Sequence, residues 1–531
     1  MTTATDDPKL QPILNYISQG WDVLTRSTKN CAGVADPKLI SSSIVYLPAD
    51  FAVPPDMAKL AEDCKVRVLP LPSVIKGPGE RGIHGEIDLP GLLYLENPYV
   101  VPGGRFNEMY GWDSYFIIRG LLRDGRVELA RGMVENFFFE IEHYGAVLNA
   151  NRTYYLTRSQ PPFLSSMVQA VYEAEKSAGH PDTAWLAKAA HYIARDYAMW
   201  THAPHLAGST GLSRYCDLGE GPVPEGLHDE SGYYRDVAAY VVRQGGKSAY
   251  LTEGSNAPGS SGFSLQVCEN HPTLSANNRT VVKRLDLSQE AYKGDRSMRE
   301  SGFDVSFRFG PFSLETDHYA PVCLNSLLYK TERDMEEIST LLGDGAAANL
   351  WRQRADQRSE TLRKLMWDAG RGLFFDFNER SGKRSTYEYA TTFYPLWAGL
   401  ATAQEAQAIA SNLHLFEHAG GLAMSRRDTG AQWDYPYGWA PIQLLAVEGL
   451  RKYGYDEDAN RIAYKFLAMV LKNFIREGTI REKYNVVTDS SVTTIKEGYK
   501  MNVIGFGWTN AVSVEFLHTL PPPWLRRLAA E

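Results

Sequence analysis

The segment 102–115, PGGRFNEMYGWDSY, combines more kinds of chemical group than any other stretch of this chain. Arg105 and Asp113 can form directional, charge-assisted hydrogen bonds, and Phe106 and Trp112 offer flat apolar faces. Two adjacent glycines allow a tight bend and a close approach of the backbone to a ligand. Few purely structural segments need all of these groups together. The combination suits a small neutral ligand that is rich in hydroxyl groups, such as a sugar.

Two acidic residues lie in contrasting surroundings. Asp304 alternates with Phe303 and Val305, an apolar frame that would raise the pKa of its carboxyl group and keep it protonated. Glu482 lies between an arginine and Lys483, whose charges would keep it ionised. Taken alone, the first pattern is typical of a turn and the second of a surface ion-pair cluster. Together they offer a proton donor and a general base for water.

Two further segments carry similar chemistry. The first, 432–441 with the sequence QWDYPYGWAP, could form an aromatic and carboxylate wall of a sugar pocket, or a structural loop that caps the following helix. In the second, 149–162, the side chains of Asn149, Arg158 and Gln160 offer amide and guanidinium groups for hydroxyl recognition. Ordinary loop structure is an equally open interpretation of that second segment.

Composition limits the class of protein. The chain has 531 residues, of which 44% are hydrophobic and 22% charged, with a net charge of -8, as expected of a globular protein. This balance indicates no nucleic-acid partner and no anionic membrane surface. The N-terminus lacks the pattern of a signal peptide, and no apolar run approaches the length of a membrane span. The five cysteines are scattered, so we expect reduced thiols, no zinc site and a cytoplasmic location.

Apolar periodicity predicts a largely helical protein. A helix is expected over 10–27, short extended segments over 42–47 and 65–70, and paired helices from residue 112 onward. Many antiparallel helix pairs fit a closed toroid or a solenoid, and the lack of a fixed repeat period disfavours a simple solenoid. The expected later helices are 112–123, 126–143, 163–178, 183–200, 324–341, 346–366, 386–399, 403–413, 437–453, 456–475 and 509–518.

At these motifs the chain resembles the trehalases of glycoside hydrolase family 37. The segments 102–115 and 432–441 match the two signatures of that family at nearly every fixed position, and the likeness extends over roughly 90–520. The resemblance implies an all-α (α/α)6 toroid, with residues 1–100 packed as a helix and extended segment on a catalytic barrel formed by 101–531, in a single catalytic domain overall. It also implies long active-site loops at one mouth of the barrel.

The resemblance further implies that α,α-trehalose is hydrolysed to two glucose molecules with inversion. Asp304 matches the family's general acid and Glu482 its general base. We expect no metal or organic cofactor, no partner besides the sugar substrate, and a monomer or weak homo-oligomer. The expected substrate-binding residues are Arg105, Phe106, Trp112, Asp113, Asn149, Arg158, Ser159, Gln160, Glu225, Gly302, Trp433 and Glu497.

The chain departs from the family pattern at two places. Many bacterial members carry an arginine where this chain has Val223, so one substrate contact must be absent or come from elsewhere, with Arg235 and Arg243 nearby in sequence. The glycine-rich lid segment is also altered, and Glu497 is our candidate for its carboxylate. Two other functions stay open at this point: a toroid glycosidase for a related glucosyl disaccharide, and a non-catalytic sugar-binding protein.

Overall fold

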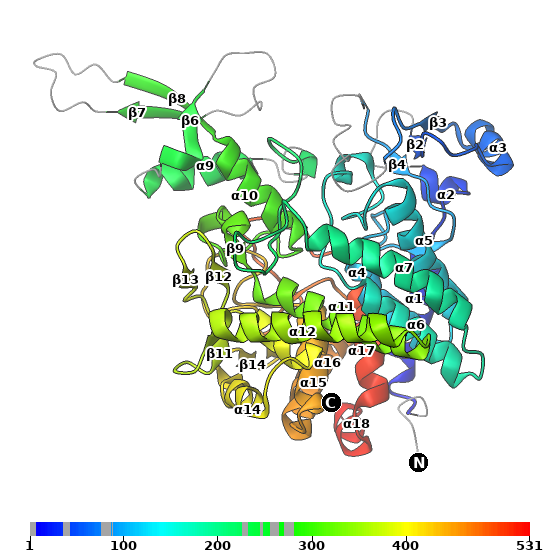
Figure 1. Ribbon diagram of the computed structural model, residues 1–531. Coiled ribbons are helices and arrows are strands. Elements are labelled where there is room, and N and C mark those ends of the chain that lie inside the picture. Colours follow the sequence, from blue (N-terminus) through cyan, green and yellow to red (C-terminus); the bar gives the residue numbers. More distant parts are fainter. Residues whose placement is uncertain are drawn as a thin grey trace, which may run out of the picture.

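The computed structural model describes residues 7–35, 43–75, 87, 89–225, 232–244, 248–254, 265–269 and 281–530. Helices dominate it, as Figure 1 shows. The helices are α1 (Gln11–Leu24), α2 (Cys31–Val34), α3 (Pro55–Cys64), α4 (Asp113–Arg123), α5 (Val127–His143), α6 (Leu164–Ser177), α7 (Thr183–Trp200), α9 (Tyr233–Arg243), α10 (Gln289–Glu300), α11 (Val322–Leu341), α12 (Gly345–Met366), α13 (Tyr394–Ala398), α14 (Ala403–Ser411), α15 (Ala440–Lys452), α16 (Asp456–Glu477), α17 (Gly507–Thr519) and α18 (Pro522–Leu528).

The strands are short and form seven small sheets of two or three strands among the described residues. They are β1 (Thr25–Arg26), β2 (Ile44–Leu47), β3 (Arg67–Pro70), β4 (Leu92–Leu93), β5 (Tyr99–Val100), β6 (Leu251–Glu253), β7 (Leu265–Glu269), β8 (Val281–Leu287), β9 (Tyr319–Ala320), β10 (Trp367–Asp368), β11 (Leu373–Phe374), β12 (Phe377–Asn378), β13 (Lys383–Arg384), β14 (Glu417–His418), β15 (Gly421–Leu422), β16 (Tyr437–Gly438) and β17 (Tyr484–Asn485).

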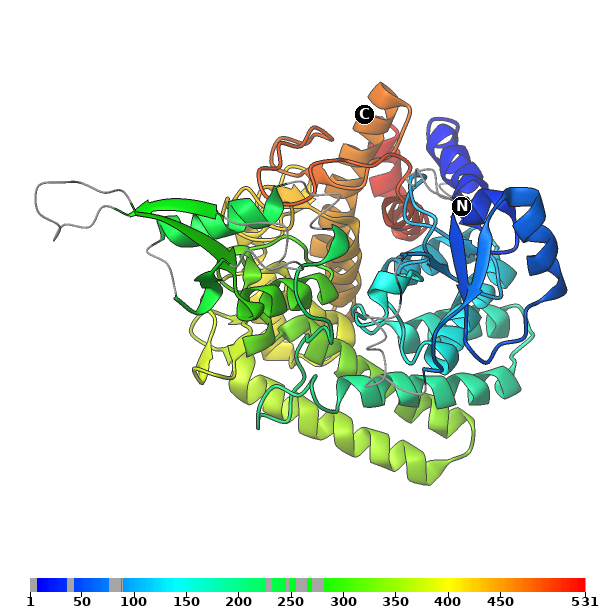
Figure 2. The same ribbon diagram turned by 90° about the horizontal axis from the view of Figure 1, so that it is seen from above.

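Within the described part of the chain, six helices form a closed inner ring. Along the ring α4 packs against α6, α6 against α11, α11 against α13, α13 against α15, α15 against α17, and α17 returns to α4. The outer helices α5, α7, α12, α16 and α1 pack against this ring, and α14 follows α13 in the corresponding place in the chain (Figure 2). The expected (α/α)6 toroid is therefore confirmed.

Burial follows position in the two rings. Every residue of α17 from Gly507 to Leu517 is buried, including the polar side chains of Asn510 and Glu515, because an inner helix is surrounded by neighbours. The outer helix α12 buries a single stripe, made of Trp351, Ala355, Arg358, Leu362 and Met366, whose spacing places them on one helical face. Burial on all sides therefore marks the inner helix α17, and burial of one stripe marks the outer helix α12.

The contact between α4 and α17 closes the ring. A Cβ atom on Gly120 would lie 2.8 Å from the Cβ of Ala511, a distance that real packing does not tolerate. Gly449 has the same function between α15 and α13, where an added Cβ would lie 2.8 Å from Leu396. Glycine at these positions lets the inner helices approach closely enough to interlock.

The N-terminal region packs on the outside of the toroid. The helix α1 contacts α17, and β1 pairs with β5 in an antiparallel ladder. Strand β2 pairs in parallel with β3 and with β4, with α3 between β2 and β3 in the chain. The expected helix and extended segments are thus present; a division near residue 100 remains a prediction.

One expectation about secondary structure needs correction. The helix expected over 386–399 is reduced to a 3-10 turn and the short α13, since Tyr389 lies in an extended conformation before them. The described part of 244–280, whose composition is loop-like, carries strands β6 and β7, which both pair with β8. In addition, the sequence periodicity did not reveal α9 or α10.

The expectation of five reduced cysteines is wrong. Cys31 and Cys64 form a disulfide, with 5.2 Å between their Cα atoms, while Cys216 and Cys323 are free and buried. The two bonded cysteines lie in α2 and at the end of α3, which pack together. Their separation of 33 residues gives no local sequence signal, because only the tertiary packing of α2 on α3 brings them together.

In the described residues, none of the helices combines the length and apolar character needed to cross a bilayer. The same residues contain no group of three or more histidine, cysteine, aspartate or glutamate side chains that could hold a metal ion.

Replacing Cys31 and Cys64 with serine should lower the melting temperature. A cross-link between residues 33 positions apart restricts the unfolded chain, and chain-entropy arguments put the effect at about 4 kcal/mol or less. Thermal melts of the double variant, and of the parent protein with and without reductant, measure it. A parent protein whose melting temperature is unchanged by reductant, and whose Cys31 and Cys64 are alkylated without reduction, would contradict the cross-link.

Candidate active site

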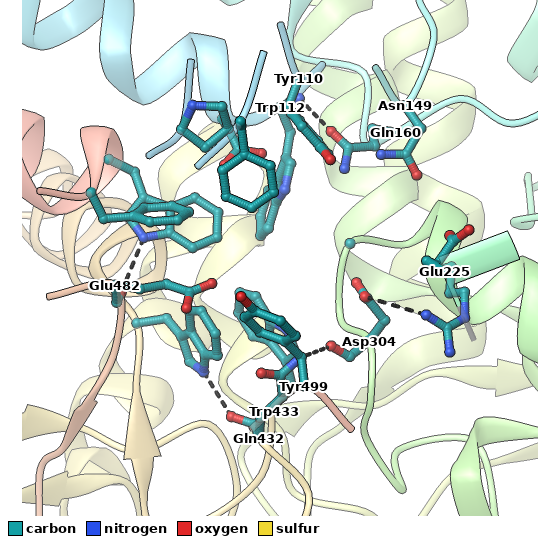
Figure 3. A pocket seen from close by; sticks show the side chains of 18 of the residues that line it. Tyr110, Trp112, Asn149, Gln160, Glu225, Asp304, Gln432, Trp433, Glu482 and Tyr499 are labelled. Atoms are coloured by element: carbon teal, nitrogen blue, oxygen red, sulfur yellow. Dashed lines mark hydrogen bonds and ion pairs between the residues drawn. The ribbon is translucent and has the colours of Figure 1, made fainter. Parts of the chain in front are cut away.

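One cavity at the mouth of the toroid collects side chains from distant parts of the chain (Figure 3). Because an outer helix runs back between successive inner helices, the N-terminal ends of the inner helices share one mouth. Most cavity residues come from the loops before α4, α6, α11, α15 and α17 or from the first residues of these helices, while Arg299 lies in α10 and Glu225 between α7 and α9. They are Pro102, Arg105, Phe106, Tyr110, Trp112, Asp113, Asn149, Tyr155, Arg158, Gln160, Glu225, Arg299, Gly302, Asp304, Gln432, Trp433, Trp439, Glu482, Tyr499, Phe506 and Trp508.

Asp304 and Glu482 line this cavity from opposite sides, and both carboxyl groups point into it (Figure 3). Asp304 lies in the loop after α10, between the buried side chains of Phe303 and Val305. Its own side chain is 36% exposed, and the guanidinium of Arg299 lies 4.0 Å from its Oδ2. The expected apolar frame is therefore present, but it does not enclose the carboxyl group, and Arg299 adds a positive charge beside it.

Glu482 lies in the loop after α16, and its side chain is 10% exposed. Its Oε2 accepts a hydrogen bond from Lys483 Nζ at 3.0 Å, while its backbone oxygen accepts bonds from Trp508 Nε1 and Thr509 Oγ1. Of the two flanking cations expected from the sequence, only Lys483 contacts it. Arg481 turns away and pairs with Glu477 at 2.9 Å.

Aromatic rings form the walls between the two carboxyl groups. Trp433 stacks on Trp439 with a centroid distance of 3.8 Å, and Trp112 packs against both Trp433 and Trp508. Gly302 has a φ of 76°, and a Cβ atom on it would lie 3.0 Å from the Trp112 ring. A residue with a side chain would be strained there and would push against the ring, so glycine shapes this wall.

A polar wall lies on the Asp304 side of the cavity. Arg158 donates from Nε to Asn149 Oδ1 at 2.7 Å and forms an ion pair with Glu225. Gln160 accepts a bond from the Trp112 backbone N–H at 3.0 Å. Burial alone would raise the pKa of Glu225, but the positive charges of Arg158 and Arg299 hold that pKa below its usual value.

Asp113 is buried at the start of α4. Burial above all raises the pKa of its carboxyl group well above the usual range, and the negative charges of Glu482 and Asp304 raise it further. A hydrogen bond from its own backbone N–H opposes this shift without reversing it. The cavity therefore holds three carboxyl groups close enough to interact, and burial disfavours the ionised form of Asp113.

Two of the residues expected to bind substrate do not line the cavity. Ser159 is fully buried and donates its hydroxyl hydrogen to the backbone oxygen of Val147; it points away while Arg158 and Gln160, on either side of it, point in. The backbone of Glu497 pairs with the loop at Gly430 and Ala431 instead. Every other expected site residue lines the cavity.

From the altered lid segment it is Tyr499 that reaches the cavity. Arg105 donates a hydrogen bond to the Tyr499 hydroxyl group, and its guanidinium lies 5.0 Å from the centre of that ring. No sequence signal pointed to Tyr499, because its segment has neither a clear periodicity nor a complete signature. The ring of Phe106 also lies near Arg105, with its centre 5.1 Å from the guanidinium group.

The arginine that Val223 replaces is not supplied by Arg235 or Arg243. Val223 is buried in a small apolar cluster, and neither of those two arginines is among the residues that line the cavity. Arg299 does line the cavity. It lies beside Asp304, and its charge helps to lower the pKa of Glu225. Arg299 begins the segment 299–304, RESGFD, which ends at Asp304, so its place in the sequence could have pointed to it.

Comparisons with known proteins show the family of this chain. The trehalase family profile matches residues 83–521. A cytosolic neutral trehalase of Saccharomyces cerevisiae is 35% identical over 95% of this chain and 70% of its own length. A cytosolic neutral trehalase of Beauveria bassiana is 39% identical over 78% of this chain and 57% of its own length.

The structural comparison extends the match to the fold. A solved neutral trehalase from S. cerevisiae superimposes with a TM-score of 0.78 at 34% sequence identity, covering 99% of this chain and 96% of that one. The chain spans 53% to 70% of the length of the curated relatives that it matches. The expected family is confirmed: this chain belongs to the trehalase family.

Proposed function

We propose that this chain is an inverting glycosidase that hydrolyses α,α-trehalose to two glucose molecules. The observation that supports this most strongly is the position of Asp304 and Glu482, which face each other across one cavity although distant loops carry them. Inverting glycosidases need two carboxyl groups on opposite faces of the sugar, roughly 6.5–9.5 Å apart, to leave room for water.

In the reaction that we propose, Asp304 gives its proton to the oxygen that bridges the two glucose units. Glu482 takes a proton from a water molecule as the oxygen of that water attacks the anomeric carbon from the opposite face. The bond between this carbon and the bridging oxygen breaks, and one glucose leaves with the proton from Asp304. The attacked carbon is inverted, and a proton exchange with water restores the two carboxyl groups.

The polar wall would bind the hydroxyl groups of the sugar. Arg158, Asn149, Gln160 and Glu225 offer donors and acceptors whose directions are set by their contacts with one another or with the backbone. A sugar that lacks a matching hydroxyl group would leave these buried groups unpaired, which is costly. We therefore expect narrow specificity, with the ring of Trp112 or Trp433 covering an apolar face of the glucose unit.

Asp113 would bind substrate as a neutral acid. The raised pKa of its carboxyl group allows it to donate a hydrogen bond to a sugar oxygen, which an ionised carboxylate cannot do. A neutral Asp113 also leaves Glu482 as the base without adding a further negative charge between it and Asp304.

We also propose a cytoplasmic location, supported by the relatives that are named cytosolic neutral trehalases. The Cys31–Cys64 disulfide is the observation against it, because disulfides are rare in reducing compartments. Alkylation of free thiols in intact cells, followed by mass spectrometry, shows whether Cys31 and Cys64 are reduced or bonded there. Reduced cysteines would agree with a cytoplasmic location. The absence of cofactors and partners other than the substrate, and a monomeric or weakly oligomeric state, remain predictions.

The variants Asp304→Ala and Glu482→Ala should each lower kcat at least about 1,000-fold, because each removes a proton-transfer group. Their circular dichroism and melting curves should show a folded protein. Glu457→Ala, on an exposed part of α16, is the control and should keep full activity. Either catalytic variant with near-normal turnover would contradict the role assigned to that residue.

Proton NMR of the first glucose molecules tests the stereochemistry. Inversion at one carbon of α,α-trehalose releases one α-glucose and one β-glucose, so the two anomers should appear at equal rates before mutarotation. Release of α-glucose alone would show retention and would rule out the proposed roles of both carboxyl groups.

The variant Asp113→Asn should be more stable than the parent protein at pH 7. In the parent, the folded state holds the Asp113 proton more tightly than the unfolded state, so stability is lost as the pH rises from the usual range of aspartate to the raised pKa. Each pH unit in this window is worth about 1.4 kcal/mol. Melting temperatures from pH 4 to pH 7 should show a growing advantage of the variant; a constant difference would contradict the raised pKa.

A further inference from the structure

A chain of hydrogen bonds crosses one wall of the cavity from Glu482 to the backbone of Asp304. Lys483 Nζ lies 3.0 Å from Glu482 Oε2 and 2.9 Å from Gln432 Oε1. At its other end, Gln432 donates from Nε2 to the backbone oxygen of Asp304 (Figure 3). We propose that Lys483 and Gln432 form a bridge that positions the base Glu482 relative to the acid Asp304. This proposal rests on the function proposed above and adds two positioning residues to it.

The side chain of Lys483 has no freedom to occupy another place. It is completely buried, and its ammonium group lies 5.1 Å from the ring centres of both Trp439 and Tyr499. A buried ammonium group is costly unless charge and hydrogen bonds compensate it, and here Glu482 and Gln432 do so. The chain bends at Glu482, and this neighbouring pair meets on the same side of the loop.

The orientation of the Gln432 amide follows from its partners. An ammonium group can only donate and a backbone carbonyl can only accept, so the amide oxygen must face Lys483 and the amide nitrogen must face Asp304. The backbone beside it strengthens the link, because the Trp433 N–H donates to the Val305 oxygen at 3.1 Å. The loop before α15 therefore holds the loop of the acid and, through Lys483, the side chain of the base.

The bridge would matter for rate because the two proton transfers need defined positions. A displacement of about 1 Å in a reacting group can cost about 100-fold in rate. The bridge joins the carboxyl group of Glu482 to the backbone of Asp304 through two side chains, with no need for the long path through the inner ring of helices. Residues that only fill space beside the cavity would not connect them in this way.

The ammonium group of Lys483 faces the charged groups of Glu482, Asp304 and Arg105. Burial above all lowers the pKa of this ammonium group, Glu482 and Asp304 oppose the shift, and Arg105 adds to it. The hydrogen bond to Glu482 Oε2 at 3.0 Å therefore helps to offset the cost of burying the charge.

The test compares Lys483→Met, Lys483→Arg and Gln432→Met. Lys483→Met keeps the length of the side chain without its charge and should lower kcat about 100-fold, with KM changed less than about three-fold. Lys483→Arg keeps a cation that can donate hydrogen bonds to both partners and should recover part of the lost kcat. Gln432→Met should lower kcat only about ten-fold, because Lys483 still contacts Glu482.

A double variant tests whether the two residues act as one unit. The fold-decrease in kcat of Lys483→Met/Gln432→Met should be clearly smaller than the product of the two single fold-decreases, since either change already breaks the bridge. Lys472→Met, whose exposed ammonium group pairs with Asp489, is the matched control and should keep the parent kcat. Circular dichroism and melting curves accompany every variant; if Lys483→Met does not fold, Lys483→Arg and Gln432→Met carry the same comparison.

Three results would overturn the bridge. They are parent kcat in folded Lys483→Met, fully multiplicative losses in the double variant, and, where only the other two variants fold, parent kcat in Gln432→Met. Any of these in an enzyme that still needs Asp304 and Glu482 would remove the bridge and leave the proposed function. Full activity of Asp304→Ala and Glu482→Ala would instead remove the function on which the bridge rests.

Discussion

The contact between α4 and α17 is the constraint on which the rest of the structure depends, because it closes the inner ring. Gly120 makes this contact possible by leaving room for Ala511. Once the ring is closed, the loop before α4 and the loop before α17 reach the same mouth, so Trp112 and Trp508 come into contact. The site is thus a consequence of ring closure and belongs to no single segment of the chain.

The closed mouth creates an electrostatic problem that the side chains solve locally. Asp113, Asp304, Glu482 and Glu225 all line one cavity, where like charges at short range repel each other. Arg158 compensates Glu225, Lys483 compensates Glu482, and burial above all raises the pKa of the Asp113 carboxyl group well above its usual range. The acidic groups of one cavity therefore lie in different electrostatic surroundings, which is how a site can assign them different roles in acid–base chemistry.

The sequence was most informative where one segment carries several reactive residue types. Residue types drew attention to the clusters around Trp112, Asp304, Trp433 and Glu482, and the resemblance to a known family gave them roles. All four of these residues line the cavity. Helices with strong periodicity were also predictable, because burial in an inner or outer ring imposes a regular pattern.

Features that depend on tertiary packing could not be predicted from the sequence. Ser159 lies between two residues that face the cavity, and only the backbone direction shows that it faces Val147 instead. Tyr499 enters the site because its segment folds back across the mouth towards Arg105. The Cys31–Cys64 pair needs α2 and α3 to pack together, and neither helix has a pattern that predicts this contact.

A crystal structure of the Glu482→Gln variant with trehalose tests the central claim most directly. We predict one disaccharide in the cavity, with its bridging oxygen within hydrogen-bond distance of the Asp304 carboxyl group. The side chain of residue 482 should then lie across the anomeric carbon, with a water molecule between them. A disaccharide bound elsewhere, or one that places both side chains on the same face of the glucose ring, would contradict the claim.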